Sequence, residues 1–277
     1  MTTYRSVLVP FAADPRAEAC LRVAVRLALA FEARLTGLFV DPELAMPAPF
    51  DDPAAFGGAD LAIAQRRHVE SRARRAAEVF ETVCREEAGI DHVWQRAAGD
   101  PGAVIAELAR LHDLVVMGQS QAEGVRLAPQ VPERVVLESG RPTLMIPYAG
   151  VFERVGGRIL VAWNGTREAA RAVADTLPLL VRAEQVVVLE IDLAEDRAAP
   201  GSALVAHLRR HGAKAEARHT VSAGIALGEI LLSAVADAGS DLLVMGAYGH
   251  SRVRELALGG VTRTVLEEMT IPVVMSY

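Results

Sequence analysis

The sequence predicts an α/β fold that is built twice: two tandem doubly wound sheets, each with five parallel strands in the order 3-2-1-4-5. Short apolar runs alternate with amphipathic helical segments, as in βαβ units with right-handed crossovers. The same pattern then starts again in the second part of the chain. Two hexapeptides, DLVVMG at 113–118 and DLLVMG at 241–246, are nearly identical. Repetition of this kind indicates duplication of one compact α/β unit.

The composition is that of a globular protein large enough for two domains. Of the 277 residues, 51% are hydrophobic and 23% are charged, and no apolar run reaches the ~18 residues of a membrane span. The first residues lack the apolar core of a signal peptide, so we expect a cytoplasmic protein without a membrane partner. The net charge of −6 disfavours nucleic acid, because phosphate backbones need a basic face. Cys20 and Cys84 fall inside helical patterns and are expected to be buried thiols.

The first copy shows its elements in order. The apolar run 6–10 predicts a strand, and a helix follows from Asp14, an N-cap carboxylate that precedes a proline. The run 35–41 predicts a second strand, and residues 42 to about 60, rich in Pro, Ala, Gly and Asp, predict a mobile insertion. The later elements are a long charged helix over 62–87, strands over 91–96, 114–117 and 142–146, and helices that begin at Asp100 and near Glu133.

The second copy repeats the strand signals of the first. Matching runs lie at 158–162, 187–192, 241–246 and 272–275. We therefore predict a first domain over residues 1–147, with an insertion at about 42–62, and a second domain over residues 157–277. The segment between them is the linker.

Glycine-rich segments follow two strands of the second copy that the topology brings together. In an open parallel sheet, ligands bind beyond the carboxyl ends of the strands, where the strand order reverses. This point lies between the first strand, which leads into Ala162–Thr166, and the fourth, which leads into Gly246 and Gly249. Gly259 and Gly260 then precede a helical pattern, where backbone N–H groups and the helix N-terminus favour an anion. The alternative is an ordinary strand exit and helix entry that use glycine.

The spacing of these glycines resembles that of the universal stress protein family, and the resemblance covers the whole chain as two tandem copies. Nucleotide-binding members carry Gly, two residues, Gly, nine residues, Gly, and then Ser or Thr. Gly246, Gly249 and Gly259 stand at this spacing, with Gly260 in place of the hydroxyl residue and Thr262 at a second hydroxyl position. The resemblance implies a Rossmann-like fold similar to that of the adenine nucleotide alpha hydrolases.

The resemblance also implies that the second copy binds an adenine nucleotide (ATP, ADP or AMP), with or without Mg²⁺, in stress response or signalling. Asn164 stands where the family usually has an acidic residue; its side-chain oxygen can still accept from ribose, whereas metal affinity falls. By resemblance, the adenine and ribose contacts map to Ala162, Trp163, Asn164, Glu190 and Ile191. The phosphate contacts map to Met245, Gly246, Tyr248, Gly249, His250, Gly259, Gly260, Val261 and Thr262.

The first copy differs at the matching positions. Gln121 stands in place of Gly249, and Pro129 and Pro132 flank the start of its last helix. Prolines remove backbone N–H donors, and a glutamine side chain crowds a loop that must approach a phosphate. We predict that the first copy binds no nucleotide and packs against the second.

Catalysis and metal binding have little support in the sequence. His250 and Ser251 are adjacent, and neighbours in sequence rarely face each other as base and nucleophile. His207, His211 and His219 lie in one region of the sequence, but no cysteine or acidic residue stands at metal-ligand spacing from them, so we predict no metal site. Without a clear base or arginine finger, we expect no enzyme beyond slow ATP hydrolysis at most. The alternative to nucleotide binding is a protein-interaction module of the same fold, in which the glycines are inherited architecture.

The last strand of each copy is a candidate pairing surface. Members of the family dimerise through this strand, and two copies in one chain can satisfy each other's edges. We therefore predict antiparallel pairing of 144–146 with 273–275 in an intramolecular pseudo-dimer. Whether two chains also form a homodimer stays open.

Overall fold

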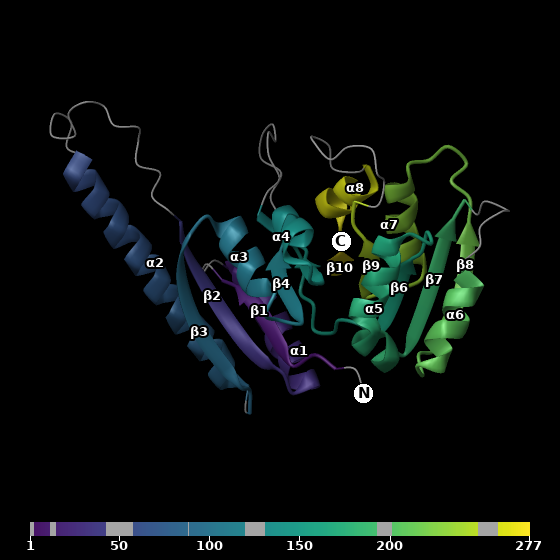
Figure 1. Cartoon of the computed structure of the whole chain (residues 1–277), viewed down its shortest axis with the longest axis horizontal. Helices are drawn as coiled ribbons and strands as arrows, with labels where there is room; N and C mark the ends of the chain where they lie inside the picture. The colour runs from purple at the N-terminus through teal and green to yellow at the C-terminus, as the bar shows by residue number, and fades with distance from the viewer. Residues whose placement is uncertain are drawn as a thin grey trace.

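A computed structural model describes residues 3–11, 15–42, 58–87, 89–119, 131–192, 201–248 and 260–277. Within these residues ten strands form one sheet, in the order β3-β2-β1-β4-β5-β10-β9-β6-β7-β8 (Figure 1). The first half contains β1 (Ser6–Pro10), α1 (Pro15–Phe31), β2 (Arg34–Pro42), α2 (Gly58–Glu86), β3 (His92–Gly99), α3 (Pro101–Ala109), β4 (Leu114–Gly118), α4 (Val131–Ser139) and β5 (Thr143–Ile146). The second contains β6 (Arg158–Ala162), α5 (Arg167–Arg182), β7 (Gln185–Ile191), α6 (Gly201–Arg210), β8 (Ala215–Thr220), α7 (Leu227–Asp237), β9 (Leu242–Gly246), α8 (Gly260–Glu268) and β10 (Val273–Ser276).

Each half has the predicted strand order 3-2-1-4-5, and its strands pair in parallel. The insertion ends earlier than the predicted residue 62, because α2 begins at Gly58. Residues 43–57 lie outside the described residues, as does the predicted N-cap Asp14. The two cysteines are buried, as predicted. Among the helices that the structure describes, none combines the length and hydropathy that a bilayer crossing requires.

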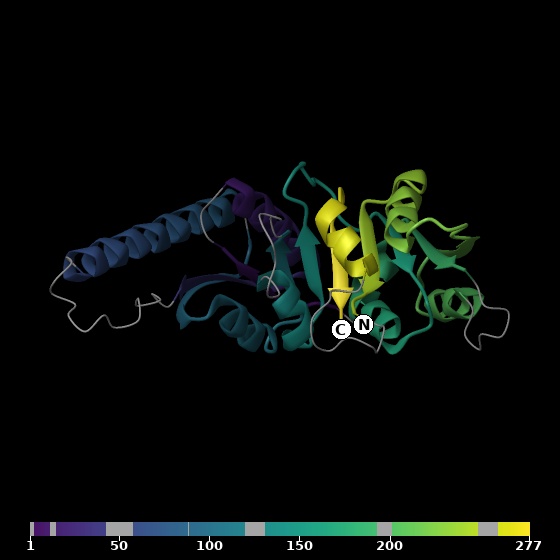
Figure 2. The same ribbon diagram turned by 90° about the horizontal axis from the view of Figure 1, so that it is seen from above.

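Helices cover both faces of the sheet. The side chains of α1, α2, α5 and α6 pack into one core, and those of α3, α4, α7 and α8 pack into the other. Both cores contain residues from the two halves, so the apolar interior runs across the whole sheet. On the β3 side α2 extends past the sheet (Figures 1 and 2), and its residues 63–68 are exposed.

The two halves join through their last strands, which pair antiparallel as the sequence predicts. Leu144 of β5 lies opposite Val274 of β10, at the centre of the contact. Further contacts cross the junction: the Tyr4 hydroxyl donates to the Asp175 backbone oxygen at 2.8 Å, and the Arg182 guanidinium lies 4.1 Å from the centre of the Phe31 ring. These contacts bind α5 of the second half to the first half.

The aspartate that opens each repeated hexapeptide has a structural role. In the first half the Asp113 carboxylate accepts from the backbone N–H groups of Arg5 and Ser6, at 2.7 and 3.0 Å. In the second half the Asp241 carboxylate accepts from the N–H groups of residues 156, 157 and 158, at 2.9 to 3.0 Å. Each carboxylate thus fixes the entry of the first strand of its half beside the fourth.

Candidate functional site

The first and fourth strands of the second half end side by side. Ala162, the last residue of β6, lies opposite Met245 of β9 and Leu189 of β7. The next residue continues this register, since the Trp163 backbone N–H donates to the Leu189 oxygen at 2.9 Å. The reversal of strand order is therefore where the sequence predicts it, and the candidate site lies beyond these strand ends.

Gly246, the last residue of β9, is held against the first turn of α5. A Cβ atom on Gly246 would lie 2.5 Å from the backbone nitrogen of Ala169 and 2.5 Å from the carbonyl carbon of Glu168. Backbone atoms inside a helix cannot yield by a rotamer change, so only glycine fits here. This glycine has a packing role whether or not a ligand is bound.

The turn after β6 is closed by its own side chains. The Asn164 side-chain oxygen accepts from the backbone N–H of Thr166 at 3.2 Å and from its hydroxyl at 2.8 Å. The Thr166 oxygen in turn accepts from the Ala169 N–H at 3.3 Å and caps α5. Asn164 therefore shapes the turn, and its amide oxygen is already engaged at the position that the resemblance gives to ribose.

The segment after β9 is tied to the start of α8. Tyr248 has a φ of +60°, and its backbone N–H donates to the Thr262 hydroxyl at 3.4 Å. Thr262 is buried, whereas Gly260, at the start of α8, is exposed, and a Cβ on it would meet no atom of the described residues within 4 Å. Of the predicted phosphate contacts, Gly260 is thus open to a ligand and Thr262 holds the loop.

Three predicted phosphate-site residues, Gly249, His250 and Gly259, lie outside the described residues. Arg263 lies on the first turn of α8, close in sequence to the predicted phosphate contacts. Its guanidinium is exposed and pairs with the Glu267 carboxylate one helical turn away, at 3.0 Å.

The predicted adenine and ribose residues divide between the two faces of the sheet. Ala162 and Ile191 pack on the α7–α8 face, together with Met245 and Val261. Trp163 instead packs against the core on the α5–α6 face. Glu190 is buried on that same face, since a Cβ on Gly201 of α6 would lie 2.7 Å from its carboxylate. Neighbouring residues of a strand point to opposite faces, so Glu190 and Ile191 cannot contact one ligand through both side chains.

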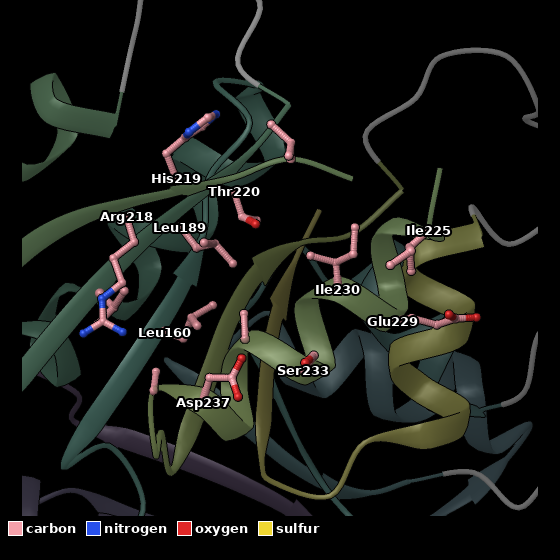
Figure 3. A pocket seen from close by; sticks show the side chains of 14 residues that line it. Leu160, Leu189, Arg218, His219, Thr220, Ile225, Glu229, Ile230, Ser233 and Asp237 are labelled. Carbon is pink, nitrogen blue, oxygen red and sulfur yellow. The ribbon is translucent and has the colours of Figure 1, made fainter. Parts of the chain in front are cut away.

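A cavity of about 550 Å³ lies on the α7–α8 face, between α7 and the strands β7 and β8 (Figure 3). It is lined by Leu160, Val187, Leu189, Arg218, His219, Thr220, Val221, Ile225, Glu229, Ile230, Ser233, Ala234, Asp237 and Ala238. Leu160 and Leu189 each precede Ala162 and Ile191 by two residues on the same strand and face. The floor of the cavity therefore continues into the candidate site. Nothing in the sequence analysis anticipated this cavity, although the small residues of α7 offered a signal.

The loop at the mouth of the cavity is fixed by Asp192. Its carboxylate accepts from the backbone N–H of Ser222 at 2.7 Å. Hydrogen bonds from the Ser222 side chain and backbone lower the pKa of Asp192 below its usual value. The carboxylate is therefore ionised at neutral pH and holds the segment between β8 and α7 in place.

The residue that follows β4 of the first half contacts the second half. The Gln119 side chain donates to the Leu266 and Glu267 backbone oxygens at 2.7 and 3.2 Å, and accepts from the Tyr148 N–H at 3.0 Å. Gln119 thereby caps the C-terminal end of α8 across the junction. Sequence reasoning named other residues of this loop and missed this one, because a single glutamine carries no pattern.

Comparisons with known proteins agree on one family. A model of the universal stress protein family matches residues 3–147 and 157–276. A universal stress protein of Archaeoglobus fulgidus superposes with a TM-score of 0.73 at 17% identity, over 98% of this chain and 95% of that one. A proposed universal stress protein of Pseudomonas aeruginosa gives 0.59 at 15% identity, over 99% and 93%. A universal stress protein of Synechocystis sp. is 58% identical over 33 residues, which is 12% of this chain and 12% of its own length. The chain belongs to the universal stress protein family, whose model it matches once in each half.

Proposed function

We propose that the second half binds an adenine nucleotide (ATP, ADP or AMP) and that the protein uses this binding in stress response or signalling. One observation carries the proposal: β6 and β9 end side by side where the strand order reverses, and α8 begins with the open Gly260 close to these ends. Parallel sheets bind ligands at such a point, and a helix N-terminus favours phosphate.

In this proposal the nucleotide lies on the α7–α8 face. Ala162 and Ile191 supply the apolar surface for the base, because both side chains lie on that face. Gly260 and its helix N-terminus supply backbone donors for the phosphates, together with Gly249, His250 and Gly259, which the resemblance assigns to them. Trp163 and Glu190, which pack on the opposite face, support the strand ends from behind.

The proposal needs no metal ligand from the protein. Residues 163–166 contain no carboxylate, and the Asn164 oxygen already accepts two hydrogen bonds from Thr166. Mg²⁺ would therefore reach the site on the nucleotide phosphates rather than on a side chain. We expect binding without appreciable hydrolysis.

The first half, in this proposal, binds no nucleotide and serves as the built-in partner of the second. The antiparallel pairing of β5 with β10 and the Gln119 cap on α8 support an intramolecular pseudo-dimer. Because Gln119 contacts the C-terminal end of α8 and the phosphates would lie at its N-terminal end, one helix connects the proposed site to the other half.

The test is to denature freshly purified protein and to identify released nucleotide by mass spectrometry. We expect about one adenine nucleotide per chain at most, lost in Gly249→Gln, which copies the residue of the first half. Gly260→Ala is a second variant of the proposed site. Its Cβ would meet no atom of the described residues within 4 Å, so it should fold normally and weaken phosphate binding only. Protein that is empty and also ignores added ATP, ADP and AMP in calorimetry would refute the proposal.

A second function, an interaction module of the same fold, has one specific observation in its favour. Gly246 and Thr262, two of the residues that suggest a nucleotide, already have packing and hydrogen-bonding roles in the protein itself. An empty protein with an intact fold would favour this alternative.

A further inference from the structure

The cavity beneath α7 is lined in part by Ala234 and Ala238, and the first half carries a larger side chain at the position that matches Ala234. Helices α3 and α7 can be matched at Gly102 and Gly228, since each glycine closely approaches the last helix of its half, at Arg134 and Thr264 respectively. Six residues further along, Leu108 corresponds to Ala234. From this glycine to its hexapeptide the second half has two more residues than the first, and His112 of the first half and Ala238 of the second both lie between the helix and the hexapeptide.

In the first half these two larger side chains fill the space over β2. Leu108 packs on the core of that face, and the His112 ring is buried, with its Nε2 3.1 Å from the Thr36 hydroxyl. In the second half Ala234 and Ala238 line the cavity instead. Among the described residues of the first half, Leu108 and His112 thus occupy space that is part of a cavity in the second half.

The cavity floor is apolar, and two large apolar side chains lie exposed at its mouth. Leu160, Val187 and Leu189 form the floor, and Ile230 lies across from them on α7 (Figure 3). At the mouth, Val221 is 61% exposed and Ile225 is 55% exposed. Large apolar side chains beside a cavity of about 550 Å³ favour a ligand with an apolar body, because small-molecule sites are mostly apolar and of this size.

The charged groups of the cavity favour a cation. Asp237 and Glu229 line it from α7, and neither forms an ion pair with another residue of the described chain. In Figure 3 the Asp237 carboxylate lies between Leu160 and Ser233, whereas Glu229 points away from them. The positive charge of Arg218 on β8 is neutralised by Glu216, at 2.9 Å. Asp237 is exposed, has no ion-pair partner among the described residues, and presents its carboxylate at the Leu160 end of the cavity floor.

We propose that this cavity binds a small organic cation: a molecule with an aromatic or branched aliphatic body and a protonated amine. The body would lie between the Leu189 floor and Ile230. The ammonium group would donate to the Asp237 carboxylate, with the Ser233 hydroxyl beside it as a further acceptor. This site is separate from the proposed nucleotide cleft, which it adjoins at Ala162 and Ile191, and it does not depend on nucleotide binding.

The probe for the test is phenethylamine, titrated into the full-length protein after removal of any nucleotide and followed by methyl NMR. Phenethyl alcohol and hydrocinnamate, its neutral and anionic analogues, serve as comparison probes. We expect saturable shifts of the Leu189, Ile225 and Ile230 methyl groups. Phenethylamine should bind about fivefold more tightly than hydrocinnamate, the ratio that a partly exposed charge pair supports. No saturable shifts, or equal binding of cation and anion, would overturn the proposal.

Two variants separate the roles of cavity and charge. Ala234→Leu with Ala238→His inserts the residues of the first half and should abolish the shifts; saturable binding that survives in the folded variant would overturn the proposal. Asp237→Asn keeps the shape, so phenethylamine should still bind but lose its preference over phenethyl alcohol. Glu107→Gln, an exposed carboxylate change on α3, is the matched control and should alter nothing. Because the titration contains no nucleotide, its result can be interpreted even if the nucleotide proposal fails.

Discussion

Gly118 and Gly246 end equivalent strands, yet their surroundings differ. A Cβ on Gly118 would meet the Cys20 sulfur at 3.4 Å, which is an ordinary contact, whereas one on Gly246 would lie 2.5 Å from backbone atoms of α5. In the second half, α5 therefore packs more closely against the end of β9 than α1 packs against the end of β4 in the first half. At this position glycine is required by packing alone.

Gly246→Ala should accordingly destabilise the protein by about 1–3 kcal/mol, the usual cost of overpacking. The clash with the added Cβ cannot be relieved by a small shift of α5, because the Thr166 cap holds the start of this helix in place. The measurement is the free energy of unfolding in a chemical denaturant. Gly118→Ala is the matched control and should cost far less; equal losses for both variants would contradict the packing argument.

Tyr4 makes the free energy of unfolding depend on pH in the alkaline range. Burial, followed by the nearby charges of Asp175 and Asp113, raises the pKa of Tyr4 well above its ordinary value of 10.0. Since the unfolded chain then loses this proton first, the free energy of unfolding should fall as the pH rises past about 10. Tyr4→Phe should reduce this dependence, at a cost of about 1 kcal/mol near neutral pH for the lost hydrogen bond to Asp175. The part that remains belongs to the buried Cys84 thiol, because burial raises its pKa to about 12.

The control for this measurement is Tyr148→Phe, because Tyr148 is 55% exposed. Its curve of stability against pH should coincide with that of the wild type. If Tyr4→Phe and the wild type lose stability alike between about pH 9 and 11, the Tyr4 hydroxyl is not the group responsible.

At the scale of single elements, α8 is held at both of its ends by different parts of the chain. Tyr248 donates to Thr262 near its start, and Gln119 of the first half donates to the Leu266 and Glu267 oxygens near its end. The last carbonyls of a helix have no partner within the helix, so an outside donor stabilises them. The orientation of α8, and with it the Gly260 end, thus depends on a residue of the other half.

Gln119→Glu tests this cap without changing the size of the side chain. A carboxylate cannot donate, and it would face two carbonyl oxygens at the negative end of the helix. We expect a loss of about 1–3 kcal/mol in the free energy of unfolding at neutral pH. Hydrogen exchange should also accelerate in α8 before it does in α7. A variant as stable as the wild type would show that the cap contributes nothing.

At the scale of the molecule, sequence patterns predict the strands, their order and the β5–β10 pairing, because each follows from apolar runs and a repeat. They also predict where the candidate site lies. They do not predict which side chains face each other across elements. The packing role of Gly246, the Gln119 cap and the cavity over Val187 depend on such contacts. One signal was present and unused: strand alternation already puts Glu190 and Ile191 on opposite faces.

The continuous sheet and its two shared cores predict that the halves unfold together. The chain offers a reporter for each, since one of its two tryptophans, Trp94, is in the first half and the other, Trp163, is in the second. In Trp163→Phe only the first half fluoresces, and in Trp94→Phe only the second. In each variant, tryptophan fluorescence should show a single unfolding transition, and its midpoint should equal the midpoint measured by far-UV circular dichroism. Adding Gly246→Ala should then lower the midpoint seen by Trp94 as much as that seen by Trp163, although the change lies in the second half. A Trp94 signal that ignores Gly246→Ala would mean that the halves are independent units joined only by their edges.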